Sequence, residues 1–330
     1  MKKLIPLSLI LILVLPFAYQ TTPLEVLKLK TFDALVKDQQ SSEYFTVLNI
    51  TENDITKEGG YPLSRQRLAE IQIELLERGA IGVGWVVAFP QPDRFGGVIQ
   101  NIHILKQNAN QGIAVARPDV DNLIRRLPLL LRTPDGWVPA FSTEVLKILA
   151  GADTYIINTN DNGIEEISVR GIPPAKTDNL GRKWISWVVP RETSLEEMNV
   201  ENTFVFVGFT AKGIMPQLAT PVGLLEPHKI QAALAESILI QDSPYIPDYA
   251  LAVEITSLIL GVIIMWLLIN LLGITLGVSL AILTMGLTLF GGYSIVQQGV
   301  LINVTWTFIS QFITATVAFY LRFREQYKLR

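Results

Sequence analysis

The polar residues that could bind a ligand follow strand-like segments of the sequence. Glu52, Asn53 and Asp54 come directly after the run 44–50, which is rich in aromatic and β-branched residues. Arg65 opens a predicted helix, and helix starts favour anions. We therefore place these four residues in a candidate ligand site. The alternative is structural: Asp54 or Asn53 sits in a turn, and Arg65 pairs with a nearby acid.

Thr210 and Lys212 form a second group, after the apolar run 204–209 that predicts a buried strand. The glycine-containing segments 82–84 and 208–213 complete neither GxGxxG nor GxxxxGK[ST], so we interpret 208–213 as a tight turn at the strand end. Open α/β sheets bind ligands at the carboxyl ends of their strands. Thr210 and Lys212 therefore join the candidate site.

Residue types limit the chemistry. The chain has no cysteine and two histidines, His103 and His228, without HExxH-type spacing. We predict no catalytic residue set, no metal site and no cofactor, and a surface or helix-packing role for both histidines. The formal net charge of −3 gives no sign of nucleic-acid binding.

A strand, a helix and a second strand should position the first group. Helical spacing runs from Ser64, a serine cap, to Gly79. The run 80–89 is continuously apolar and predicts a strand covered on both faces. With the strand at 44–50 this order predicts a βαβ unit.

The remaining patterns complete an exported α/β domain with a mixed sheet over residues 24–245. We predict helices at 24–40, 93–108, from a cap at Ser142 or Thr143 to Leu149, and at 226–240. Strands are predicted at 112–116, 155–158 and 184–189. The segments 124–131 and 136–140 flank Thr133-Pro-Asp-Gly136 and predict a hairpin.

A long apolar stretch follows, from Leu251 to Leu321, with Glu254 as its one charged residue. A crossing helix needs about 20 apolar residues. Turn signals divide the stretch into three predicted spans at 251–270, 274–296 and 301–321. Glu254 lies near the outer end of the first span, where we expect it to be hydrated; a functional membrane acid is the alternative.

Two charge patterns set the expected topology. Lys2 and Lys3 precede the apolar run 4–19, which we interpret as a signal anchor over 1–20 rather than a cleaved signal peptide. Residues 322–330 form a short basic tail, and cations beside a span mark the cytoplasmic side. Both patterns place the α/β domain outside the cytoplasm, on a multi-pass protein of the cell inner membrane.

Six segments, in order, resemble the second type of CHASE sensory domain, an extracellular sensor associated with cyclases and histidine kinases. They are Phe32-Asp33, Gly60-Tyr-Pro-Leu-Ser-Arg65, Glu77-Arg-Gly-Ala-Ile-Gly-Val-Gly84, Asp121-Asn-Leu-Ile-Arg-Arg-Leu-Pro128, Phe204-Val-Phe-Val-Gly-Phe-Thr-Ala211 and Ala219-Thr-Pro221. The chain departs from the family pattern at Thr51-Glu-Asn-Asp54, where paired aspartates are usual, at Trp85 in place of an aspartate, and at Gln231 in place of a histidine.

The resemblance implies a membrane-anchored sensor that binds an unknown ligand or partner and passes its state to a cytoplasmic output protein. Because the sequence shows no catalytic residue set, we expect that the chain is not an enzyme. Family members usually continue into a cyclase or kinase domain, and this sequence ends at Arg330. We therefore expect a separate output protein, with a structural subunit of an envelope complex or a fragment of a longer sensor as alternatives. Expected partners are membrane lipid and a second copy in a homodimer.

Overall fold

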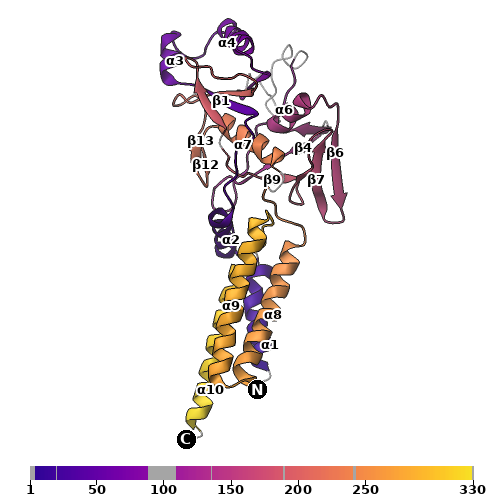
Figure 1. Cartoon of the computed structure of the whole chain (residues 1–330), viewed down its shortest axis with the longest axis vertical. Helices are drawn as coiled ribbons and strands as arrows, with labels where there is room; N and C mark the ends of the chain where they lie inside the picture. Colours follow the sequence, from indigo (N-terminus) through magenta and orange to yellow (C-terminus); the bar gives the residue numbers. More distant parts are fainter. Residues whose placement is uncertain are drawn as a thin grey trace. The chain divides into compact units, whose positions relative to one another are not determined.

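The computed structural model describes residues 4–19, 21–87, 109–134, 136–188, 190–240 and 243–328. The chain divides into two compact units. Residues 38–243 form one, here called the α/β unit, and residues 1–37 with 244–330 form the other, here called the helical unit (Figure 1). The predicted helix at 93–108, His103 and the end of the predicted strand at 80–89 lie outside the described residues.

A four-stranded parallel sheet lies at the centre of the α/β unit. Its strand order is β10-β1-β11-β2, and the strands are β1 (Phe45–Ile50), β2 (Gly82–Trp85), β10 (Arg191–Ser194) and β11 (Phe204–Phe209). All three neighbouring pairs are parallel. The predicted mixed sheet was therefore wrong. Long connections separate these strands in the sequence, as parallel pairing requires, and the antiparallel pairs form small separate sheets.

The predicted strand–helix–strand order is present, but β11 lies between the two strands. The helices that follow β1 are α3 (Glu52–Lys57) and α4 (Arg65–Glu77). Ser64 caps α4 as predicted, since its Oγ accepts a hydrogen bond from the Arg67 amide at 3.1 Å. Gly79, with φ of +91°, follows the end of the helix.

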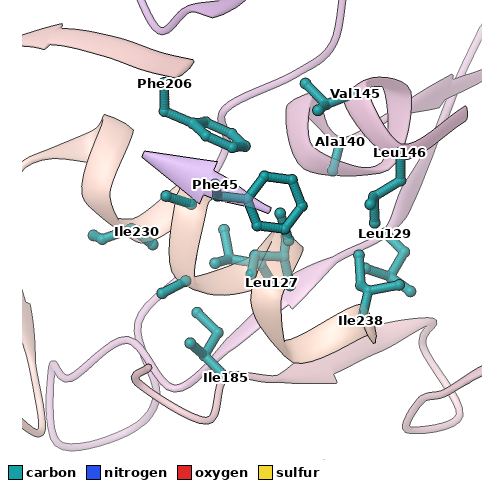
Figure 2. Packing of buried hydrophobic residues seen from close by; sticks show 14 of the residues in the cluster. Phe45, Leu127, Leu129, Ala140, Val145, Leu146, Ile185, Phe206, Ile230 and Ile238 are labelled. Atoms are coloured by element: carbon teal, nitrogen blue, oxygen red, sulfur yellow. The ribbon is translucent and has the colours of Figure 1, made fainter. Parts of the chain in front are cut away.

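Alternate residues of β1 and β11 enter two different cores, because successive strand side chains point to opposite faces. Phe45, Val47 and Phe206 pack under α6 (Phe141–Leu149) and α7 (Pro227–Leu239). Figure 2 shows Phe45 and Phe206 together beside Ile230 and Ile238 of α7, and their ring centroids lie 5.6 Å apart.

The other face of the sheet packs against α3 and α4. Leu48, Val205 and Val207 contact a core that includes Ile71 and Leu75 of α4. All six residues of β11 are buried. The prediction of a strand covered on both faces at 204–209 is confirmed.

Four small antiparallel sheets surround this core. Their strands are β3 (Arg126–Pro128) with β9 (Arg182–Trp184), β4 (Leu130–Thr133) with β5 (Gly136–Pro139), β6 (Tyr155–Asn160) with β7 (Gly163–Val169) and β8 (Ala175–Lys176), and β12 (Leu218–Thr220) with β13 (Gly223–Leu225). The predicted hairpin is confirmed, with Thr133 opposite Gly136. The predicted strand at 155–158 is also confirmed, and it extends to Asn160.

Three local predictions in this region were wrong. The predicted strand at 112–116 is reduced to one bridge between Ile113 and Ala140. The predicted strand at 184–189 ends where it was expected to begin, and Trp187 has φ of +54°, which a strand does not tolerate. Helix α6 starts after Ala140, without a side-chain cap. Ser142 lies inside it and donates to the Gln231 side chain at 2.6 Å, so its hydroxyl joins α6 to α7.

The helical unit contains α1 (Ile5–Ala18), α2 (Thr22–Leu35), α8 (Ala250–Leu271), α9 (Ile274–Gln297) and α10 (Thr305–Lys328). Among the described residues, α8 and α9 are long and apolar enough to cross a membrane. A bent pair, 5–17 with 22–35 at 77°, would make a third crossing if it acts as one span. The predicted third C-terminal span corresponds to α10, which is long enough but less apolar than α8 and α9. Its polar residues include Ser310, Gln311 and Thr314, whose side chains are buried.

Two charged residues of the helical unit have partners that the sequence did not reveal. The expected hydrated position of Glu254 was wrong, since its side chain is 1% exposed and its carboxylate lies 2.9 Å from Lys28 Nζ. It also accepts the Asn303 amide at 2.8 Å. Arg322, placed in the basic tail, donates to the carbonyls of Ile269 and Leu272 at the end of α8, where helix carbonyls lack internal partners.

Candidate functional site

Thr210 and the run 52–54 lie at the carboxyl edge of the parallel sheet, because they follow the ends of β11 and β1 and parallel strands end at the same edge. β1 ends at Ile50 and β11 at Phe209, and the Thr210 amide donates to the Ile50 carbonyl at 2.9 Å. The Thr210 hydroxyl contacts the same carbonyl at 3.4 Å. Thr210 and the residues that follow Ile50 are therefore neighbours, as the sequence predicted.

Asp54 has a structural role at this edge. Its Oδ2 accepts the Thr51 amide at 2.8 Å and the Thr51 hydroxyl at 2.7 Å, and its own amide donates to Thr51 Oγ1 at 3.3 Å. These bonds form a capping box that begins α3. Asp54 is 8% exposed, and its carboxylate already accepts two hydrogen bonds from Thr51, so it is not available to a ligand.

The side chains of four other candidates are exposed to solvent. These residues are Glu52, Asn53, Arg65 and Lys212. Within the described part of the chain, no hydrogen bond or ion pair joins Arg65 or Lys212 to another of the candidates. The structure thus brings Thr210 beside the end of β1 but does not assemble all six residues into one network.

A connected polar network that the sequence did not predict lies at the amino end of α7. Asn49 of β1 donates through Nδ2 to Glu192 of β10 at 2.6 Å, and His228 Nε2 lies 2.9 Å from Asn49 Oδ1. Lys229 Nζ lies 3.0 Å from Glu192 and 3.6 Å from Glu226. Gln217 completes the network by donating to Glu226 at 2.9 Å.

His228 is neutral in this network. Its side chain is buried, and burial lowers its pKa to about 4, despite the opposing influence of Glu226. Asn49 uses its amide nitrogen on Glu192, so its oxygen faces the ring, and the Nε2 of His228 must carry the proton. The expected helix-packing role of His228 is confirmed, because its ring also packs against Gly208 of β11. A Cβ at Gly208 would lie 2.3 Å from two atoms of that ring.

The exposed end of this network could recognise a polar or charged ligand. The Glu192 side chain is 39% exposed and that of Lys229 15% exposed, while His228 is 1% exposed. A ligand that engaged Glu192 or Lys229 would disturb the bonds that reach Asn49 and His228. In the ranges that the structure describes, no group of three or more histidine and acidic residues could hold a metal ion.

A second charged cluster, at the segment Asp121 to Pro128, is closed to ligands. Arg125 is fully buried and donates to Asp121 through two bonds of 2.8 Å, and Arg126 pairs with Asp119 and with Asp178 at 3.3 Å. The Arg125 guanidinium holds the pKa of Asp121 below its usual value. This cluster fixes β3 beside β9, and we assign it to the fold.

Sequence reasoning missed the network because it joins β1, β10 and the amino end of α7, which are distant in the chain. Glu192 lies on a short strand that no periodic pattern predicted, and Asn49 looks like an ordinary strand residue. The one available signal was His228, a polar residue in the apolar helix pattern at 226–240.

Searches of curated proteins and of solved structures found no match. A family model, the CHASE2 domain, matches residues 9–272. That match covers well over half of the chain, in agreement with the resemblance seen in the sequence. The chain therefore belongs to the CHASE2 family of extracellular sensor domains.

Proposed function

We propose that this protein is a membrane-anchored sensor whose exported α/β unit binds a polar ligand or partner and passes its state across the membrane to a separate output protein. The network at Asn49, Glu192, His228 and Lys229 is the sensing site, with Glu52, Asn53, Arg65, Thr210 and Lys212 along the same sheet edge. The chain binds and transmits and has no catalytic role. Membership of a sensor family and two helices suited to a membrane support this proposal.

One observation carries the proposal: α7 joins the network to both chain connections of the α/β unit. Near its carboxyl end, the buried Glu236 accepts the Ser41 hydroxyl at 2.7 Å and the Ser42 amide at 2.8 Å. Ser41 and Ser42 belong to the segment between α2 and β1. A displacement of α7 at His228 would therefore act on the chain that comes from the helical unit.

The same end of α7 also holds the segment that leads to α8. The Ser237 hydroxyl accepts the Ser186 amide at 2.8 Å, and the Ser186 hydroxyl lies 3.2 Å from that of Ser243. The buried Lys183 ammonium lies 3.5 Å from the Ser243 carbonyl. A ligand can shift an equilibrium only if it binds two states differently. Here the two states are two positions of α7, and both connections follow it.

A paired substitution tests the transmission without a known ligand. Glu192→Gln removes the charge that Lys229 binds and keeps the side-chain size. We expect it to change hydrogen exchange at the Ser42 and Ser186 amides in the full chain, at the opposite end of α7. The control is Glu196→Gln, which removes the charge partner of Lys57, 2.5 Å away, and touches no residue of α7. Unchanged exchange in Glu192→Gln, or equal changes in both variants, would contradict the proposal.

A further inference from the structure

Residues 298–304 form the turn that joins α9 to α10, and this turn holds the chain segment that leads from the α/β unit into α8. The Tyr245 amide donates to the Gly299 carbonyl at 2.9 Å, and the Leu301 amide donates to the Tyr245 carbonyl at 2.9 Å. These two bonds form a parallel bridge between Tyr245 and Val300. The chain connection that leaves the α/β unit at residue 243 is therefore fixed next to the start of α10.

Helix α2, which leads into the α/β unit through the other connection, bonds to the same region. The Leu35 carbonyl at the end of α2 accepts the Gln297 side chain at 2.8 Å, directly before the turn. The Thr305 hydroxyl, at the first residue of α10, donates to the Thr31 hydroxyl at 3.3 Å. Both chain connections therefore reach the α9–α10 turn and the start of α10, although they are distant in the sequence.

One buried carboxylate joins these contacts. Glu254 of α8 is 1% exposed, and its Oε1 lies 2.9 Å from Lys28 Nζ of α2 and accepts the Asn303 amide at 2.8 Å. The Asn303 side chain accepts the Thr305 amide at 2.9 Å. If α2 carried Lys28 away, Glu254 would remain buried without its cation, which strongly destabilises a buried pair. The position of α2 and the conformation of the turn are thus coupled through Glu254.

We propose that the Lys28–Glu254 pair is a latch that couples the position of α2 to that of α10, with Glu254 as the positioning residue. While the pair is closed, Glu254 holds the Asn303 amide and the start of α10. When α2 moves, Glu254 follows its cation or turns to water, and the Asn303 amide loses its acceptor. The inference rests on the proposed function for the source of this movement, and it assigns α10 as the helix that carries it.

Helix α10 is suited to this role because it is continuous. It runs from Thr305 to Lys328, and its 24 residues span about 36 Å. It is held to α8 by the hydroxyls of Ser257 and Thr307, 2.9 Å apart. A change in the position of its first turn therefore displaces its far end, where the basic tail begins.

Spin-label distances in the full chain, reconstituted in lipid vesicles, test the latch, because the chain has no cysteine besides those introduced. Tyr293→Cys near the end of α9 and Arg324→Cys near the end of α10 provide two exposed labelling sites. Lys28→Met should shift the main distance between the labels by several ångströms, and Glu254→Gln added to it should restore the original distance. The control Lys30→Met removes an exposed cation of the same helix and should change nothing.

An unchanged distance in Lys28→Met, or a shift that Glu254→Gln does not reverse, would overturn the latch. Loss of Lys28 as a structural contact alone would disturb α2 without moving the far end of α10. Glu254→Asp provides a milder opening where Lys28→Met does not fold, because it keeps the charge and shortens the side chain. It should shift the same distance in the same direction, and an unchanged distance in this variant also overturns the latch.

Hydrogen exchange separates the latch from the proposed function. In the full chain with Glu192→Gln, the Leu301 and Asn303 amides should change their exchange together with the Ser42 amide. A change at Ser42 that does not reach Asn303 would overturn the latch and leave the sensing site standing. An unchanged Ser42 would contradict the proposed function alone, because the spin-label distances decide the latch without any signal from the sensing site.

Discussion

Gly208 offers a prediction whose size follows from the geometry. A Cβ built at this position lies 2.3 Å from Cγ and Nδ1 of His228 and 2.7 Å from its Cβ. Carbon atoms in contact sit at about 3.5–4.0 Å. The backbone of Gly208 has no left-handed φ, so close approach to α7, and not backbone conformation, requires a glycine here.

Rotation of the His228 ring cannot relieve this clash, because the Cβ of His228 is also too close. Helix α7 would have to move away from β11, and both elements are buried. Overpacked cores lose about 1–3 kcal/mol, and we expect Gly208→Ala to lie at the upper end, about 3 kcal/mol. Gly208→Val should cost more.

Hydrogen exchange of β11 amides in the detergent-solubilised chain measures this loss. A change of about 3 kcal/mol corresponds to exchange that is roughly 100-fold faster, provided β11 exchanges by global opening. In a His228→Gly background, which removes both the ring and the Cβ that the added methyl group would meet, the cost of Gly208→Ala should fall below about 1 kcal/mol. An equal cost in both backgrounds would refute the assignment of the clash to His228.

Four further predictions follow from buried charges and from the proposed function. Burial, and to a smaller extent repulsion from Lys176, lowers the pKa of Lys183 from 10.5 to about 7. Between pH 7 and 10.5 the unfolded chain therefore binds one more proton at Lys183 than the folded chain does. The free energy of unfolding should therefore rise with pH in this window by about 1.4 kcal/mol per unit, and Lys183→Met should abolish the slope in urea titrations. Lys28→Met leaves Glu254 buried without its cation and should cost about 3 kcal/mol in thermal unfolding, which Glu254→Gln in the same chain should largely restore. Residues 38–243 expressed alone should unfold cooperatively in urea; persistent aggregation would contradict the division into units. The purified full chain should show no ATP or GTP turnover, and stoichiometric turnover would contradict the non-enzymatic proposal.

The strongest elements of the fold could be predicted because their patterns are local. The runs 44–50 and 204–209, the Ser64 cap and the helix at 226–240 each combine composition with clear boundaries. The arrangement of the sheet could not be predicted, because β11 inserts between β1 and β2 from more than 100 residues away. Short strands such as β8 and β10 carry too few residues for any periodic signal.

The same contrast between local patterns and tertiary contacts explains which residues of the candidate site could be predicted. Thr210 and the residues after β1 were found because the carboxyl ends of parallel strands meet at one edge. Asp54 was assigned to ligand binding, although its carboxylate already accepts hydrogen bonds from Thr51. The sequence of residues 51–54 does not distinguish a bonded carboxylate from one that is free to bind a ligand. The network around His228 depends on tertiary contacts alone. Glu254 was misjudged for the same reason, because Lys28 reaches it from 226 positions earlier in the chain.

The location of the α/β unit outside the cytoplasm is central to the proposed sensor, and cysteine accessibility in intact cells measures it directly. Asp161, in the exposed turn between β6 and β7, and Arg324, near the end of α10, are each replaced by cysteine in the otherwise cysteine-free chain. A membrane-impermeant thiol reagent should label Asp161→Cys in intact cells and Arg324→Cys only after permeabilisation. The reverse pattern would contradict the proposed sensor.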